Sequence, residues 1–356
     1  MTDTVLYVVW EAGENRNHLL SWADAMHNCE PGSHIIFCDP GEERIAPHNS
    51  VCEVDDQRAL ADKLFDIKQS RNLTVEFITG NVQPTPEIFC INPGDGISIR
   101  QLFDTVTLWP FYLWQAHAFM NFTLTKEQST RSKFLVCKNN RGHNHRLIMV
   151  DQLYRNQLQQ DNILTWNVTL DKYQHQCQYW QPHLRRHPEY DLTTGQVYVP
   201  SQCDRGPDYM HSEVVGYNDS AVELVCEGSD KLMFFTEKTY NAILTKKVFL
   251  IHGCRYINQT LTRYGFRLFD NIFDYGFDQF QDTLDRAANI SDQLSNLSHI
   301  PPQEIYEQCK PILDHNYAVL MEILSSDEYY PMHVVEQHPE YKQIYNYNKK
   351  VAGKKC

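Results

Sequence analysis

Residues 233–278 read MFFTEKTYNAILTKKVFLIHGCRYINQTLTRYGFRLFDNIFDYGFD, and this stretch decides the fold. Thr236 is a typical helix N-cap, and the apolar residues of TYNAIL follow at helical spacing. The run VFLIHG is typical of a buried strand in a parallel sheet. A second helix is expected over 257–264, with Gly265 at its C-terminal end. Helix, strand and helix in this order predict an α/β domain.

The first turn of the expected helix has the chemistry of an anion site. Its unpaired backbone N–H groups and its dipole favour negative charge. Lys238 adds a full positive charge in the same turn, and Glu237 can accept hydrogen bonds from hydroxyls. Together with Thr236 they suit a ligand that carries both phosphates and sugar hydroxyls, which describes a nucleotide sugar. The alternative is a capped surface helix with a solvated lysine, since such caps are common.

The same residues resemble a known group of enzymes. FFTEKTYNAIL, VFLIHG and YGFRLFDNIFDYGFD are together similar to the C-terminal half of phage and large-virus glycosyltransferases. The TEK core at 236–238 also resembles the donor-binding motif of α1,3-fucosyltransferases. The chain departs from the viral pattern at Ala242, where a proline is common, and at 274–278, where DYGFD replaces DExYD. The resemblance implies a GT-B-like fold, an α/β architecture of two Rossmann-like domains that face a cleft.

A second motif precedes the first, in KFLVCKNNRGHNHRLIMVDQLYRNQL at 133–158. Lys138, Arg141 and Arg146 crowd one strand-to-helix turn, where a diphosphate binds when cations lie beside a helix N-terminus. The alternative is a solvated basic loop. NNR and HR within this turn resemble the opening of the second domain in the same viral enzymes.

The resemblance covers roughly residues 131–280 and also involves Glu227. This glutamate ends the expected strand AVELVCE, and in the family an acidic residue at that point lies close to the donor. The alternative, that Glu227 is only an N-cap or a loop charge, is equally open. The resemblance further implies that Lys238 and Arg146 bind the diphosphate, with Arg141 as a third cation, and that Glu237 binds ribose or sugar hydroxyls.

The N-terminal part alternates strands with helices, which predicts a parallel sheet and a Rossmann-like domain. Strands are expected over 4–10, 34–40 and 73–79, and helices over 18–29, 56–71 and 102–120. Ligands bind at the C-terminal ends of such strands. The loop carboxylates Glu11, Asp39 and Asp95 are therefore candidates for the general base that an inverting transfer needs. A retaining transfer needs no such base, and the sequence leaves both mechanisms open.

With 356 residues the chain is long enough for two domains. We expect a Rossmann-like, acceptor-binding domain over 1–130, a donor-binding domain over 131–330, and a C-terminal extension over 331–356. The net charge of −13 argues against a nucleic-acid partner, because non-specific binding needs a basic surface.

The sequence also bears on compartment and metal. No apolar run reaches the roughly 18 residues of a membrane span, and the first apolar run reads as a strand rather than a signal peptide. The eleven cysteines form no CxxC pair and are expected to be free thiols in the cytoplasm, which is the host cytoplasm if the protein is viral. Sequons such as the one at Asn258 are then chance matches. The His-rich segment 175–187 fits no zinc spacing, so no metal is expected.

These features predict a metal-independent glycosyltransferase that moves a sugar from a nucleotide-diphosphate sugar, such as a UDP- or GDP-sugar, to a hydroxyl of a glycan or another acceptor. No cofactor beyond this co-substrate is expected. Two alternatives stay open. One is a non-catalytic protein that binds nucleotide sugars or glycans, and the other is a phage-type DNA-base glycosyltransferase, which needs a basic stripe that the overall acidity disfavours.

Overall fold

The computed structural model describes residues 4–8, 18–39, 54–79, 102–108, 131–139, 144–158, 160, 162–166, 219–230, 233, 235–337 and 339–353. The chain divides into two compact units, which are Met1–Leu113 with Ser326–Tyr347, and Trp114–Ser325 with Asn348–Cys356. Each unit contains a parallel β-sheet flanked by helices, so the chain belongs to the α/β class.

The first unit is built on a four-stranded parallel sheet. Its strands are β1 (Thr4–Val8), β2 (His34–Asp39), β3 (Thr74–Thr79) and β4 (Thr105–Leu108), and its helices are α1 (His18–Asn28) and α2 (Val54–Arg71). The strands lie side by side in chain order. A doubly wound Rossmann sheet instead reverses its strand order at a switch point, and the described strands of this unit contain no such reversal.

The core of the first unit is centred on Trp22 of α1. Its ring stacks on Phe37 of β2 at 4.4 Å between centroids, and Phe77 of β3 meets it edge-on at 5.5 Å. Leu64 of α2 belongs to the same cluster, so both helices cover one face of the sheet. This burial explains why the alternating strands and helices of the N-terminal part could be identified from their apolar pattern.

One expected element is wrong. The helix expected over 102–120 does not begin there, because Thr105–Leu108 forms strand β4, which pairs in parallel with β3. Its residues TVTL include three β-branched side chains, which favour a strand over a helix. Residues 109–120 lie outside the described part of the chain.

The C-terminal segment of the first unit contacts its sheet through Glu76 of β3. Helix α11 (Met332–Val335) carries His333, whose Nε2 lies 3.1 Å from Glu76 Oε1. The Thr107 hydroxyl donates to the same oxygen at 2.8 Å. These contacts hold a segment far along the chain against strands near its beginning.

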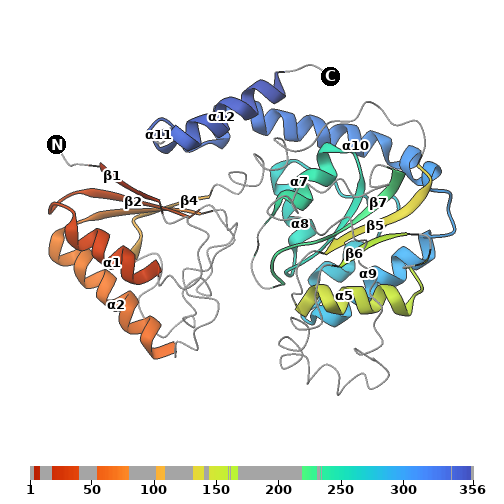
Figure 1. Ribbon diagram of the computed structural model, residues 1–356, viewed down its shortest axis with the longest axis horizontal. Coiled ribbons are helices and arrows are strands. Elements are labelled where there is room, and N and C mark those ends of the chain that lie inside the picture. The colour runs from red at the N-terminus through yellow and green to blue at the C-terminus, as the bar shows by residue number, and fades with distance from the viewer. Residues whose placement is uncertain are drawn as a thin grey trace. The chain divides into compact units, whose positions relative to one another are not determined.

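The second unit has a different topology. Its strands are β5 (Lys133–Asn139), β6 (Ile163–Trp166), β7 (Ser220–Cys226) and β8 (Val248–His252), all parallel, in the order β6-β5-β7-β8. Helices α5 (Asn144–Arg155) and α9 (Thr283–Leu297) pack together on one face, and α7 (Glu237–Leu244) and α10 (Pro302–Ser325) pack on the other (Figure 1). The strand order reverses between β5 and β7, which makes this sheet doubly wound.

The segment after β8 forms the expected short helix. Helix α8 (Ile257–Leu261) continues as a 3₁₀ turn over Thr262–Tyr264 and ends at Gly265, whose φ of 87° is the left-handed value that favours glycine. The DYGFD sequence contributes Asp278, a buried carboxylate that accepts 2.9 Å hydrogen bonds from the Asn258 side chain and from the backbone N–H of Gln259. Asn258 is also buried, so its sequon is not open to modification in the folded protein.

Three further helices complete the described C-terminal part, namely η6 (Tyr275–Gln279), η7 (Asp327–Tyr329) and α12 (Pro339–Ala352). Within the described ranges no helix is long and apolar enough to cross a membrane. The six cysteines in these ranges are all buried, and none of them forms a disulfide; they are Cys29, Cys38, Cys137, Cys226, Cys254 and Cys309.

Candidate functional site

The candidate site lies where the strand order of the second unit reverses. Strands β5 and β7 are neighbours there, and their C-terminal ends meet at one edge of the sheet. In doubly wound sheets, ligands bind in the crevice outside the strand ends at such a switch point. The sequence motifs around residues 138–146 and 227–238 flank these two strand ends, so the topology brings them to one place.

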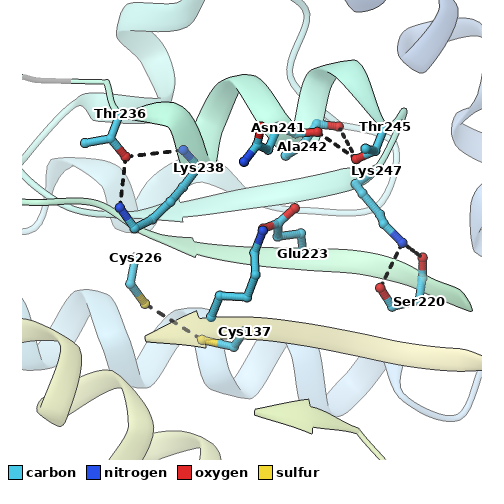
Figure 2. Close-up of polar contacts among 11 residues, drawn as sticks. Cys137, Ser220, Glu223, Cys226, Thr236, Lys238, Asn241, Ala242, Thr245 and Lys247 are labelled. Carbon is cyan, nitrogen blue, oxygen red and sulfur yellow. Dashed lines mark hydrogen bonds and ion pairs between the residues drawn. The ribbon is translucent and has the colours of Figure 1, made fainter. Parts of the chain in front are cut away.

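The N-terminus of α7 is the first component of the site. Thr236 is its N-cap, with extended backbone angles of φ −102° and ψ 179°, and its hydroxyl accepts a 3.4 Å hydrogen bond from the Lys238 backbone N–H. The Lys238 ammonium reaches back to the same hydroxyl at 3.2 Å, as Figure 2 shows. Lys238 is half-buried. A positive charge is thus held in the first turn of a helix, next to backbone donors that favour anions.

Glu227 is the second component, and it follows β7 directly. Its Oε1 accepts a 3.0 Å hydrogen bond from the Thr236 backbone N–H and another from the Thr239 hydroxyl. Its Oε2 is buried and has no hydrogen-bond partner among the described residues. Burial raises the pKa of the Glu227 carboxyl, while the Lys238 charge and the two threonines act against that rise. The site therefore contains a carboxylate oxygen that can still accept a hydrogen bond.

The third component is Arg146, which is buried in α5. Its Nε and Nη2 donate to the backbone carbonyl of Glu227 at 3.1 and 3.0 Å, and its Nη1 makes no hydrogen bond within the described ranges. His145 Nε2 lies 2.8 Å from the same carbonyl. Two successive residues of α5 thus hold the main chain at the end of β7.

His252, the last residue of β8, supports this arrangement from the other side. Its Nε2 donates to the His145 carbonyl at 3.1 Å, and its own carbonyl accepts the Glu227 backbone N–H at 3.0 Å. Burial lowers the pKa of His252 to about 4, and the charge of Arg286 acts in the same direction. The ring is therefore neutral at pH 7. Because Nε2 carries the proton, the buried Nδ1 is an acceptor, and it has no partner among the described residues.

Beneath the site, β5 and β7 contact each other through two thiols. Cys137 Sγ and Cys226 Sγ lie 3.9 Å apart, and Figure 2 shows them between the strands. Burial raises the pKa of the Cys226 thiol. Its contact with Cys137 and the charges of Arg146 and Lys238 lower the pKa and together outweigh the effect of burial, so the net shift is downward. The two cations are linked geometrically through Glu227, because Arg146 donates to its carbonyl and Lys238 bonds to Thr236, whose backbone N–H donates to its carboxylate.

Not every candidate from the sequence joins this cluster. Lys138 lies within β5, not in the turn after it, and forms a 3.1 Å ion pair with the buried Glu223. Asp39 ends β2 and Glu237 begins α7, but the side chains of both lie outside the described part of the chain. Three further candidates lie outside it completely, namely Glu11, Asp95 and Arg141. The roles expected for these residues stay predictions.

Three residues of the site were missed by the sequence reasoning, namely His145, His252 and Thr239. The signal for His145 was present, since it precedes Arg146 in the basic HR step. His252 ends a buried strand just before Gly253, where a polar side chain is unusual in an apolar run. The Thr239 contact depends on the return of the chain from β7 to α7, which has no local signature.

A structural metal site needs several ligating side chains close together. No group of three or more His, Cys, Asp or Glu side chains among the described residues has the arrangement of a metal site. The His-rich segment 175–187 lies outside the described part of the chain.

Comparison with known proteins gives little beyond the geometry. No protein-family model matches this sequence, and no curated protein matches it. Among solved structures the chain is similar to one described as "Crystal Structure of alpha1,3-Fucosyltransferase". The two share 12% sequence identity with a TM-score of 0.38, over 100% of this chain and 92% of the other. A likeness this distant identifies neither the fold nor the function of the chain.

Proposed function

We propose that this protein is a glycosyltransferase that transfers a sugar from a nucleotide-diphosphate sugar to a hydroxyl acceptor. The observation that carries the proposal is the gathering of Arg146, Lys238 and the N-terminus of α7 around Glu227, at the switch point between β5 and β7. Anions bind at helix N-termini with cations beside them, and ligands bind at switch points. A diphosphate satisfies both conditions.

In this proposal each component has a separate task. The Lys238 ammonium and Nη1 of Arg146 bind the diphosphate and stabilise the negative charge that develops on the departing nucleoside diphosphate. Charge stabilisation of this kind is commonly the largest contribution to catalysis. Oε2 of Glu227 accepts a hydrogen bond from a hydroxyl of the donor, and Glu237 does likewise.

The remaining parts of the proposal come from the sequence. The acceptor, a glycan or another hydroxyl compound, binds to the N-terminal domain across a GT-B-type cleft. A general base from that domain, with Glu11, Asp39 and Asp95 as candidates, removes the acceptor proton if the transfer inverts configuration. The two cations take the place of a metal ion, so the reaction proceeds in the presence of EDTA.

The test is a thermal-shift screen with UDP, GDP, CDP and their sugars. A ligand at 100 times its Kd stabilises a protein by about 2.7 kcal/mol, which gives a clear shift. We expect one nucleotide class to stabilise the wild type and Lys238→Ala to abolish that shift. Lys246→Ala is the matched control, because Lys246 pairs with Asp314 beyond the other end of α7. A shift that survives Lys238→Ala, or no shift with any nucleotide, contradicts the proposal.

Enzyme and binding protein are then separated by turnover. An enzyme releases free nucleoside diphosphate from the stabilising donor, slowly with water and faster with the right acceptor. A protein that binds the donor but never cleaves it is the non-catalytic alternative. Binding to a DNA duplex that weakens steeply with salt is the mark of the DNA-modifying alternative.

A further inference from the structure

The loop that follows β8 carries an exposed aromatic ring in an unusual backbone conformation. Tyr256 is 37% exposed and has φ 65° and ψ 17°, which is the left-handed region that bulky residues rarely adopt. Such conformations persist where the surroundings enforce them, and they concentrate at ligand sites. The loop lies at the same edge of the sheet as the candidate site, because β7 and β8 are parallel neighbours.

Arg255 fixes the ring in place. Its guanidinium carbon lies 4.6 Å from the centre of the Tyr256 ring, and its Nη2 donates to the Tyr256 hydroxyl at 2.7 Å. Its other two nitrogens are also bound, Nε to the Gln279 carbonyl at 2.7 Å and Nη1 to the Gln281 side chain at 3.2 Å. The guanidinium is therefore rigid, and the aromatic ring is ordered before any ligand arrives.

Two contacts connect this loop to the proposed diphosphate site. A Cβ added at Gly253, three residues before Tyr256, would lie 3.3 Å from Glu227 Cβ, so the two main chains are packed closely. Cys254 Sγ lies 3.6 Å from Met233 Sδ, on the segment that leads into α7. The loop is anchored by Arg286, whose Nη2 donates to the Gly253 carbonyl at 3.0 Å.

We propose that Tyr256, backed by Arg255, is the stacking platform for the nucleobase of the nucleotide donor. The inference rests on the proposed function and deepens it. Aromatic side chains bind bases of any kind through their π-faces. The cation behind the ring draws electron density from it, which weakens contacts with sugar C–H groups and favours an electron-rich base. The neighbouring diphosphate site selects the same occupant, because the base and the diphosphate belong to one ligand.

The test compares ligands with and without a base. Binding of UDP, GDP and inorganic pyrophosphate is measured by calorimetry for the wild type, Tyr256→Asn and Tyr256→Phe. Asparagine tolerates the left-handed conformation, so Tyr256→Asn removes the ring and keeps the backbone. Tyr329→Asn is the matched control, since Tyr329 is also 37% exposed but belongs to the first unit.

We expect Tyr256→Asn to weaken binding of the preferred nucleoside diphosphate by at least about fivefold, as loss of one base–aromatic stack does. Pyrophosphate binding stays unchanged, and Tyr256→Phe and Tyr329→Asn bind as the wild type does. Unchanged nucleotide affinity in Tyr256→Asn overturns this inference but not the proposed function. The same holds if Tyr256→Asn loses as much affinity for pyrophosphate as for the nucleotide, or if it changes only the KM of the acceptor. A wild type that binds no nucleotide overturns the proposed function, and this inference with it.

Discussion

Replacement of Lys247 by methionine should remove a large pH dependence from the stability of the second unit. Lys247 is completely buried just before β8, and its amine donates to the backbone carbonyl of Ser220 and, at 2.9 Å, to the Ser220 hydroxyl (Figure 2). Burial lowers the pKa of Lys247 from 10.5 to about 6, and the charge of Arg131 acts in the same direction. At pH 7 to 9 the folded protein therefore holds this lysine as a neutral amine.

The sign follows from proton counting. The unfolded chain binds a proton at Lys247 up to a pH of about 10.4, whereas the folded chain releases it above about 6. Between these values the unfolded state binds one more proton, so the free energy of unfolding rises with pH. The slope is about 1.4 kcal/mol per pH unit, which gives roughly 3 kcal/mol between pH 7 and pH 9.

Urea denaturation at pH 7, 8 and 9 measures this effect. We expect the wild type to gain roughly 3 kcal/mol more than Lys247→Met over this range, because methionine cannot bind the proton. Lys246→Met is the control, since Lys246 precedes Lys247 directly but is half-exposed and pairs with Asp314. The loss of the two bonds to Ser220 lowers the stability of Lys247→Met equally at every pH. Parallel stability curves for the wild type and Lys247→Met would refute the reasoning.

Further predictions concern the proposed site. Thr236→Ala should lower the free energy of unfolding by about 1 kcal/mol in urea melts, while Thr236→Ser keeps the cap and the stability. Gly253→Ala should cost about 1–3 kcal/mol and weaken nucleotide-induced thermal shifts, because the new Cβ would lie 2.9 Å from Ile257 Cδ1 and press on Glu227. Burial raises the pKa of Glu227, so its carboxylate destabilises the fold as the pH rises through the folded-state pKa. The stability of Glu227→Gln relative to the wild type should therefore grow between pH 4 and pH 7 in urea melts, and a constant difference would contradict this.

Local features of the site were predictable because they depend on neighbours in the chain. Thr236 caps α7 with its hydroxyl, and Gly265 ends the 3₁₀ turn because its lack of a Cβ permits the left-handed conformation. The buried strands β7 and β8 follow from apolar runs. The strand at Thr105–Leu108 was missed because the aromatic residues after it suggested one long helix, although TVTL itself favours a strand.

Long-range features were not predictable in the same way. The strand order β6-β5-β7-β8, which creates the switch point, is set by pairing between segments more than 80 residues apart and leaves no pattern in either strand. The left-handed conformation of Tyr256 could not be predicted from the sequence either, because the local backbone preference of a tyrosine opposes it. The tertiary fold imposes it through the 2.8 Å bond from the Tyr256 backbone N–H to the Asp278 carbonyl.

The two proposed phosphate-binding cations differ in what their removal would mean. Arg146 holds the Glu227 carbonyl with two nitrogens, and His252 holds the Glu227 backbone N–H from the neighbouring strand. Replacing Arg146 therefore removes a charge and also releases the main chain that positions the carboxylate. Lys238 instead bonds to the hydroxyl of Thr236 in its own helical turn, and α7 retains its cap from the Thr236 side chain without it. An Arg146 variant therefore loses a charge and a main-chain support together, whereas Lys238→Ala leaves the Thr236 cap of α7 in place.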